Sequence, residues 1–259
     1  MKRELFAAAA IPIMVVTIGW LPAWAFLAIL WAAAVLACDE YLKLARAADI
    51  VVGRWLVLIL MGALLLASWL YGVNGLAITA VAALVILPTV RLARTESPQG
   101  SLAGVAAECF AVLYLGATAA CHGWLRLWPE EPGGVKVLFF FLACIWVGDS
   151  GAYYVGKNFG RHKMSPKISP NKTIEGLVGC IVTTYVAAAA AAYILDLELG
   201  AIHVFALATI LAAAAPLGDL VESLFKRDSG IKDSSNLIPG HGGLLDRTDS
   251  LFYLSLIHI

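Results

Sequence analysis

Charged residues are scarce in this chain. Asp, Glu, Lys and Arg make up 14% of its 259 residues, whereas hydrophobic residues make up 61% and the mean hydropathy is +0.85. A soluble protein of this length cannot enclose so much apolar surface in one core. The formal net charge is zero, which predicts no nucleic-acid partner. The composition therefore predicts an all-α polytopic integral membrane protein.

Cysteine pairs are also missing. The five cysteines form no CxxC motif and lie within or at the ends of apolar stretches. They predict small packing residues and neither a disulfide framework nor a zinc site. No fixed-period repeat, low-complexity tract or separate soluble domain is evident in the sequence either.

Long apolar segments are abundant instead. A helix that crosses the hydrocarbon core needs about 20 residues. Eight segments approach that length, namely 5–20, 22–38, 55–71, 74–90, 101–124, 136–156, 174–195 and 201–225. A ninth starts at residue 250, but only ten residues follow Asp249, about half of a crossing. We therefore expect about eight complete transmembrane helices and a truncated ninth, with a shortened end or a foreign tail.

The N-terminus allows two interpretations. Lys2 and Arg3 precede an apolar run that extends to Ile18, and Ala23-Trp24-Ala25 would suit a signal-peptide cleavage site. A second apolar run follows at once, however, which favours a helical hairpin broken near residues 19–22.

Basic residues divide unequally between the two sides of this arrangement. With a cytoplasmic N-terminus, 16 of the 18 Lys and Arg residues lie on the cytoplasmic side, and only Arg126 and Lys136 lie outside. This division obeys the positive-inside rule. It predicts a multi-pass protein of the inner (plasma) membrane, with the polar segments 157–172 and 226–249 facing the cytoplasm.

Two smaller polar features lie in the first half of the chain. The segment Asp39–Arg54 is expected to form a short amphipathic helix at the membrane interface. Glu108 lies within the fifth apolar segment, where an ionisable side chain needs a partner. We expect it to form a hydrogen bond between helices.

One segment is rich in charge. Between Asp219 and Asp249, ten of 31 residues are Asp, Glu, Lys or Arg. Asp219, Glu222, Ser223 and Lys226 have the spacing i, i+3, i+4 and i+7, which puts them on one stripe of a helix. Acidic residues in an apolar helix are costly unless they face water, a cation or a partner. An internal ion pair with Lys226 that joins helices is the simpler alternative.

The residues after this stripe favour a phosphate site. Arg227 and Lys232 supply cations, and the glycine-rich run 239–243 leaves backbone N–H groups open to phosphate oxygens. Asp246 and Asp249 then add carboxylates. Hard oxygen ligands beside a cationic, glycine-rich turn suit a substrate that carries magnesium and phosphate.

A second polar block lies upstream. Asp149 lies at the end of the sixth apolar segment, and the loop 157–172 contains five basic residues, most of which the positive-inside rule explains. The loop ends in SPNKT at 169–173, where the proline is expected to fix a turn and Lys172 offers a point charge for phosphate. The nearby GAYYVGKN at 151–158 is one residue from a P-loop pattern, but it ends an apolar helix and predicts no nucleotide site.

These motifs resemble those of the phosphatidate cytidylyltransferases, or CDP-diacylglycerol synthases. The resemblance rests on SLFKR at 223–227, KD at 232–233 and PGHGGLLDRTD at 239–249, in that order and spacing. GDSGAYYVGKNFG at 148–160 and SPNKTIEG at 169–176 are similar to other recurrent segments of that family. The likeness is strong over 145–250, and upstream it is one of hydropathy and topology. We expect N-terminal transmembrane helices at 1–135 and a catalytic transmembrane region at 136–259.

The resemblance implies a reaction, in which the cytidylyl group of CTP is transferred to phosphatidate, giving CDP-diacylglycerol and pyrophosphate with Mg²⁺ required. It implies catalytic roles for Asp219, Lys226, His241 and Asp246. The metal ligands that it implies are Asp219 and Asp246, with Asp149 and Asp249 nearby. The implied substrate-binding residues are Ser169, Asn171, Lys172, Thr173, Ser223, Arg227, Lys232, Gly242, Gly243 and Arg247. A second, monovalent cation and a homodimer stay open, and the bilayer is the expected surrounding.

Two other function classes also stay open. A CTP-dependent membrane lipid kinase of the polyprenol or phytol type would need a similar cytoplasmic, magnesium-dependent nucleotide site. A polytopic transporter would place its buried acids near mid-membrane in paired broken helices. The crowding of polar groups at one face and the lack of a repeat favour the enzymes.

Overall fold

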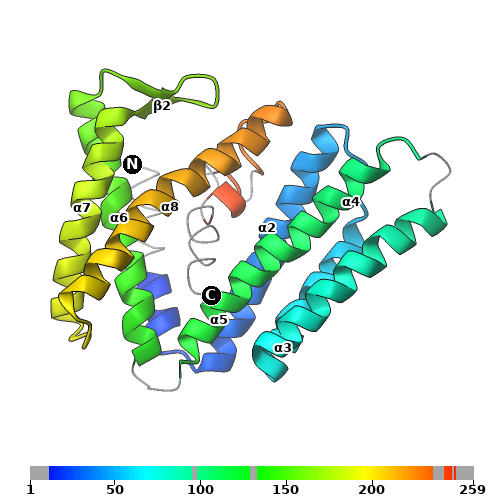
Figure 1. Cartoon of the computed structure of the whole chain (residues 1–259), viewed down its shortest axis with the longest axis horizontal. Helices are drawn as coiled ribbons and strands as arrows, with labels where there is room; N and C mark the ends of the chain where they lie inside the picture. Colours follow the sequence, from blue (N-terminus) through cyan, green and yellow to red (C-terminus); the bar gives the residue numbers. More distant parts are fainter. Residues whose placement is uncertain (1–11, 95–97, 129–132, 236–241, 247, 249–259) are drawn as a thin grey trace. The chain divides into compact units, whose positions relative to one another are not determined.

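The computed structural model describes residues 12–94, 98–128, 133–235, 242–246 and 248, and most of these are helical (Figure 1). Six helices among them are long and apolar enough to cross a membrane. They are α2 (Ala23–Ala47), α3 (Arg54–Arg94), the continuous helix Ser101–Arg126, α6 (Gly133–Phe159), α7 (Ile174–Ile194) and α8 (Ala201–Asp228). The predicted class, an all-α polytopic membrane protein, is confirmed. The expected count of eight spans is not.

The difference in count comes from the first half of the chain. α3 contains a break at Gly72, whose φ of 58° and ψ of −139° are not helical. The expected segments 55–71 and 74–90 are thus two helical stretches joined at a residue whose backbone suits glycine alone. The first expected span is described only from residue 12 and is helical over 12–19. A short non-helical segment ending at Pro22 separates it from α2, as predicted.

The segment expected to form an interfacial helix is instead the end of α2. This helix continues through Asp39 and Glu40 to Ala47, and both acidic residues are buried. Asp39 pairs with Lys43 at 2.9 Å and with Arg54, the first residue of α3, at 2.6 Å. The prediction of a separate amphipathic helix is wrong. The two acids find polar partners within the fold, so they do not depend on water at the membrane interface.

The described residues form two compact units. The first contains those within 12–124 and 225–248, which are α2, α3, α4 (Ser101–Phe110), the π-helix η1 (Ala111–Gly116), most of α5 (Ala117–Arg126) and the end of α8. α3 packs against α2, α4 and η1. Glu108 on α4 lies 2.5 Å from the Arg91 guanidinium on α3 and accepts a hydrogen bond from Gly53 N at 2.6 Å. The expected interhelical contact of Glu108 is confirmed.

The second unit contains the residues within 125–224, which are α6, strands β1 (Lys163–Ser165) and β2 (Ser169–Thr173), α7 and α8 as far as Leu224. α6 and α7 lie side by side (Figure 1). Their backbones approach closely, since a Cβ added at Gly151 would clash with Thr183 and one at Gly179 would clash with Val155. Small residues that allow such an approach are typical of membrane helix pairs. GAYYVGKN lies within α6, so it forms no strand-to-helix phosphate loop.

SPNKT is a strand and not the turn that we expected. β2 pairs antiparallel with β1, with Lys163 opposite Thr173 and Ser165 opposite Ser169. Pro170 is accommodated because a two-stranded hairpin has free edges, where a missing N–H donor costs little.

Candidate functional site

The residues predicted to act on phosphate and metal fall into two polar clusters. One, which we call the Asp219 cluster, lies in the second unit and comprises Asp149, Lys172, Asp219 and Ser223. The other, the Glu40 cluster, lies in the first unit and comprises Glu40, Lys226, Ser234, Ser235 and Asp246. α8 supplies residues to both, since it belongs to the second unit up to Leu224 and to the first from Phe225.

In the Asp219 cluster, the carboxylate of Asp219 is only lightly held. Its Oδ2 lies 2.6 Å from Lys172 Nζ, although the two groups lack the alignment of a hydrogen bond. Ser223 Oγ lies 3.5 Å from its Oδ1, at the limit of a hydrogen bond. The Asp219 side chain is 43% exposed. Asp149 on α6 interacts electrostatically with both Asp219 and Lys172.

The local sequence explains where Lys172 lies. The next residue, Thr173, is the N-cap of α7, and its hydroxyl accepts a hydrogen bond from Gly176 N at 3.1 Å. Glu175 in the first turn of α7 accepts hydrogen bonds from the backbone N–H groups of Arg161 and His162, which fixes the start of the hairpin. Lys172 is thus held at the junction of β2 and α7, one residue before a capped helix.

Of the other residues predicted in SPNKT, Asn171 is exposed and Ser169 is half-buried in the hairpin. The Thr173 hydroxyl, which was predicted to bind substrate, already caps α7. Lys172 is therefore the residue of SPNKT that the structure brings next to another predicted site residue.

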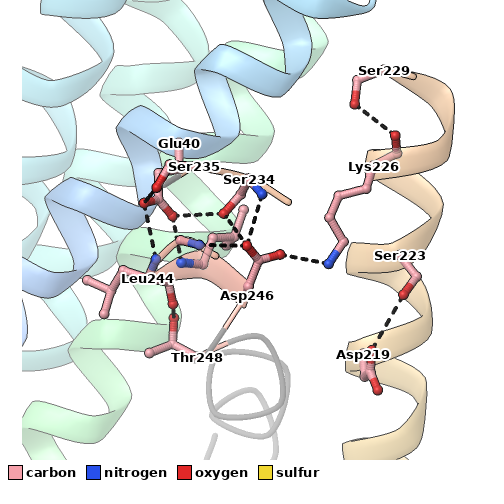
Figure 2. A network of polar contacts seen from close by, with 12 residues as sticks. Glu40, Asp219, Ser223, Lys226, Ser229, Ser234, Ser235, Leu244, Asp246 and Thr248 are labelled. Carbon is pink, nitrogen blue, oxygen red and sulfur yellow. Dashed lines mark hydrogen bonds and ion pairs between the residues drawn. The ribbon is translucent and has the colours of Figure 1, made fainter. Parts of the chain in front are cut away.

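In the Glu40 cluster, Asp246 is held by several donors (Figure 2). Its Oδ1 lies 2.7 Å from Lys226 Nζ on α8. Its Oδ2 accepts hydrogen bonds from Gly243 N at 2.7 Å and from both the N–H and the hydroxyl of Ser234 at 2.9 Å. Only 4% of the Asp246 side chain is exposed. The sequence had predicted Lys226 and Asp246 as site residues, and the structure brings them into contact.

The sequence did not predict the role of Glu40. This residue on α2 is 3% exposed, and four donor groups lie within hydrogen-bond distance of its two carboxylate oxygens. The donors are Ser235 Oγ at 2.6 Å, Leu245 N at 2.7 Å, Ser234 Oγ at 3.0 Å and Leu244 N at 3.1 Å. The available signal was an acidic residue in an apolar helix, which marks a functional candidate by default.

Gly242 and Gly243, which were predicted to bind substrate, lie within this network. Gly242 has a φ of 82°, which favours glycine. A Cβ on Gly243 would clash with the side chains of Ser234 and Glu40. Glycine is needed at both positions because the backbone lies close to the carboxylates of Asp246 and Glu40.

The remaining predicted site residues fall into two groups. Arg227 and Lys232 are exposed. His241, Arg247 and Asp249 lie outside the described residues. Asp219 and Asp246 belong to different units, and a metal shared between them stays a prediction.

The donors of the Asp219 cluster fit magnesium. In the part of the chain that the structure describes, no group of three or more His, Cys, Asp or Glu residues forms a complete metal cage. Magnesium does not need one, because it keeps several waters and binds one or two carboxylates together with substrate phosphates. Asp219, with an exposed carboxylate and Asp149 nearby, meets that requirement. Asp246 fits it less well, because both of its oxygens already accept protein donors.

Comparison with known proteins then identifies the family. Residues 1–259, the whole chain, match the cytidylyltransferase family. The chain belongs to this family. Membership confirms the resemblance that the motifs indicated.

Curated relatives in this family are phosphatidate cytidylyltransferases. That of Bacillus subtilis (strain 168) is 40% identical over 144 residues, which cover 56% of this chain and 53% of the relative. Those of Staphylococcus aureus (strain COL) and Staphylococcus haemolyticus (strain JCSC1435) are 41% and 39% identical over 138 residues, which cover 53% of each chain compared. The chain thus spans about half the length of the curated relatives that it matches.

Proposed function

We propose that this chain transfers the cytidylyl group of CTP to phosphatidate and so makes CDP-diacylglycerol and pyrophosphate. Family membership and the names of the relatives support a cytidylyltransferase, and six apolar helices support a substrate that resides in the membrane. The observation that carries the proposal is that α8 supplies one partner to each of two lysine–carboxylate pairs. These pairs are Lys172–Asp219 and Lys226–Asp246.

Such pairs suit a transfer between two polyanions. In the proposed step, a phosphate oxygen of phosphatidate forms a bond to the α-phosphorus of CTP, the bond from that phosphorus to the β-phosphate bridging oxygen breaks, and pyrophosphate leaves with the electron pair. The phosphate is already an anionic nucleophile, so the protein mainly has to orient the substrates and neutralise their charge. Lys172 and Lys226 are the ammonium groups proposed for this, and Asp246 holds Lys226 in position.

We propose Asp219 and Asp149 as the residues that would hold Mg²⁺. When bound there, Mg²⁺ supplies positive charge against the phosphate oxygens. The Lys172 ammonium can then leave Asp219 for a substrate phosphate, because its ion pair lacks hydrogen-bond alignment and the Asp219 side chain is partly exposed.

We also propose that the site faces the cytoplasm from the inner membrane, as the distribution of basic residues favours. Single cysteines at Asn171 and Lys232, both exposed, test this in a background without the native cysteines. An impermeant thiol reagent should label both only after the cytoplasmic side is opened. Labelling of either from the periplasmic side of intact cells would contradict the proposal.

The reaction is tested by incubating the purified chain with CTP and phosphatidate, with and without Mg²⁺. CTP labelled in the α-phosphate should give a labelled liponucleotide, and pyrophosphate should appear in equal amount. A lipid kinase would instead release CDP and would transfer label from the γ-phosphate. If the folded protein forms neither the liponucleotide nor CDP, it does not have the proposed activity.

A further inference from the structure

The Glu40 clamp, by which we mean Glu40 with its four hydrogen-bond donors, joins the first half of the chain to the segment that carries the family motif. All of the donors lie within residues 234–245, and Glu40 lies almost 200 residues earlier, on α2. Two donors are the backbone N–H groups of Leu244 and Leu245, so Glu40 directly fixes the main chain at these two residues. A carboxylate that accepts several N–H and O–H donors in a buried place is a strong and directional anchor.

The clamp also reaches Asp246 through one hydroxyl. Ser234 Oγ lies 3.0 Å from Glu40 Oε2 and 2.9 Å from Asp246 Oδ2, between the two carboxylates (Figure 2). A hydroxyl has one hydrogen and can donate to only one of them at a time. Ser234 also donates its backbone N–H to Asp246 Oδ2 at 2.9 Å, so this one residue links Glu40 to Asp246, and through Asp246 to Lys226.

We propose that Glu40 is a positioning residue for the proposed nucleotidyl transfer. It holds residues 242–246 so that Asp246 keeps the Lys226 ammonium aimed at substrate phosphate. This inference rests on the proposed function and assigns to the N-terminal half a part in the reaction that the motif residues alone do not indicate. Glu40 itself is not proposed to contact a reacting atom.

The experiment compares Glu40→Gln, Glu40→Asp and Asp39→Asn in the full-length chain. Glutamine keeps the size of the side chain but removes the charge and one acceptor oxygen. Aspartate keeps the charge on a shorter side chain. Asp39 is the matched control, because it is the adjacent buried acid on α2 and pairs with Lys43 and Arg54 outside the loop.

We expect Glu40→Gln to lower kcat by on the order of a hundredfold with KM for CTP changed less than about threefold, since small misplacements of catalytic groups act mainly on the transition state. Glu40→Asp should recover at least about tenfold of that loss, because the donors regain an anionic acceptor. Asp39→Asn should keep kcat within about threefold. Hydrogen exchange at residues 242–246 should rise in Glu40→Gln and stay unchanged in Asp39→Asn.

Three outcomes would overturn the inference. Glu40→Gln could retain wild-type kcat, its loop exchange could stay unchanged, or its loss of activity could match its loss of folded protein. If the wild-type chain makes no liponucleotide, the proposed function fails separately. Hydrogen exchange in Glu40→Gln then tests the positioning role of Glu40 separately. A rise confined to residues 242–246 would support this role, and no rise would contradict it.

Discussion

The two polar clusters hold their carboxylates in different ways. In the Glu40 cluster, the Asp246 side chain is 4% exposed, and its two oxygens lie next to one ammonium, two backbone N–H groups and one hydroxyl that Glu40 also contacts. In the Asp219 cluster, the Asp219 side chain is 43% exposed and has one ion pair and one long contact. The first carboxylate is therefore saturated by the protein, and the second has capacity left for a ligand.

This difference suggests a division of labour. A buried carboxylate with many donors is rigid and suits the positioning of another group. A partly exposed carboxylate whose ammonium partner can leave suits an exchangeable cation or substrate. We infer that the Glu40 cluster organises the loop and Lys226, and that the Asp219 cluster binds the metal. Substitutions at matching positions in the two clusters can contradict this division.

The largest effect is expected at Asp219. Asp219→Asn should lower kcat/KM by on the order of a thousandfold, because it removes the exposed carboxylate proposed to hold Mg²⁺ at the reacting phosphates. The half-saturating Mg²⁺ concentration should rise as well. Product formation over a range of Mg²⁺ concentrations measures both, and Asp228→Asn, at the exposed end of the same helix, is the control.

Asp246→Asn sharpens this test. If Asp246 positions Lys226 and does not hold metal, its substitution should lower kcat while the half-saturating Mg²⁺ concentration stays within about twofold of wild type. If both single variants and the double variant show the same residual activity and the same weakened magnesium dependence, the two carboxylates share one metal. The division proposed here would then be wrong.

The next largest effect is expected at the lysines. Lys172→Ala and Lys226→Ala should each lower kcat/KM by on the order of a hundredfold, about 3 kcal/mol, through the loss of a charge-assisted phosphate contact. Lys163→Ala, on the exposed strand β1, should stay within a few-fold. Liponucleotide formation at fixed ionic strength measures all three.

The lysines should differ in their effect on stability. Lys226→Ala removes the ammonium beside a buried carboxylate and should destabilise the fold by about 3 kcal/mol. Lys172→Ala breaks a pair whose carboxylate side chain is 43% exposed and should change the free energy of unfolding by less than about 1 kcal/mol. Thermal unfolding in detergent tests this contrast. If Lys226→Ala and Lys172→Ala shift Tm equally, the Glu40 and Asp219 clusters do not differ in how firmly they hold their lysines.

Hydropathy and motif spacing predicted much of this molecule. Apolar length indicated where the described helices lie, although not that 55–71 and 74–90 form the single element α3, because a membrane-spanning helix satisfies its own backbone and its length follows from bilayer thickness. Spacing along α8 placed Asp219 and Lys226 on one helix, because helical periodicity is local, and both form ion pairs; their roles in the reaction stay predictions. The sequence also indicated that Glu108 needs a partner, although not that Arg91 provides it.

Several features that the sequence did not reveal are non-local. Glu40 contacts backbone groups more than 200 residues later in the chain, and no local sequence pattern spans that separation. The β2 strand depends on its pairing with β1, which Pro170 and the surrounding polar residues concealed. The division of Asp219 and Asp246 between two units could not be read from the charge-rich segment 219–249, which contains both.

The smallest effect on activity is expected at Glu108. This acid is as buried as Glu40, but its partners are the Arg91 side chain and Gly53 N, which belong to no cluster described above. Glu108→Gln leaves the Arg91 guanidinium without its anionic partner, at a cost of about 2 kcal/mol to folding. We expect a lower Tm with kcat of the folded protein within about threefold of wild type. A large fall in kcat at unchanged Tm would mean that any buried acid in the first unit affects catalysis. The contacts of Glu40 with residues 234–245 would then not explain its effect on the reaction.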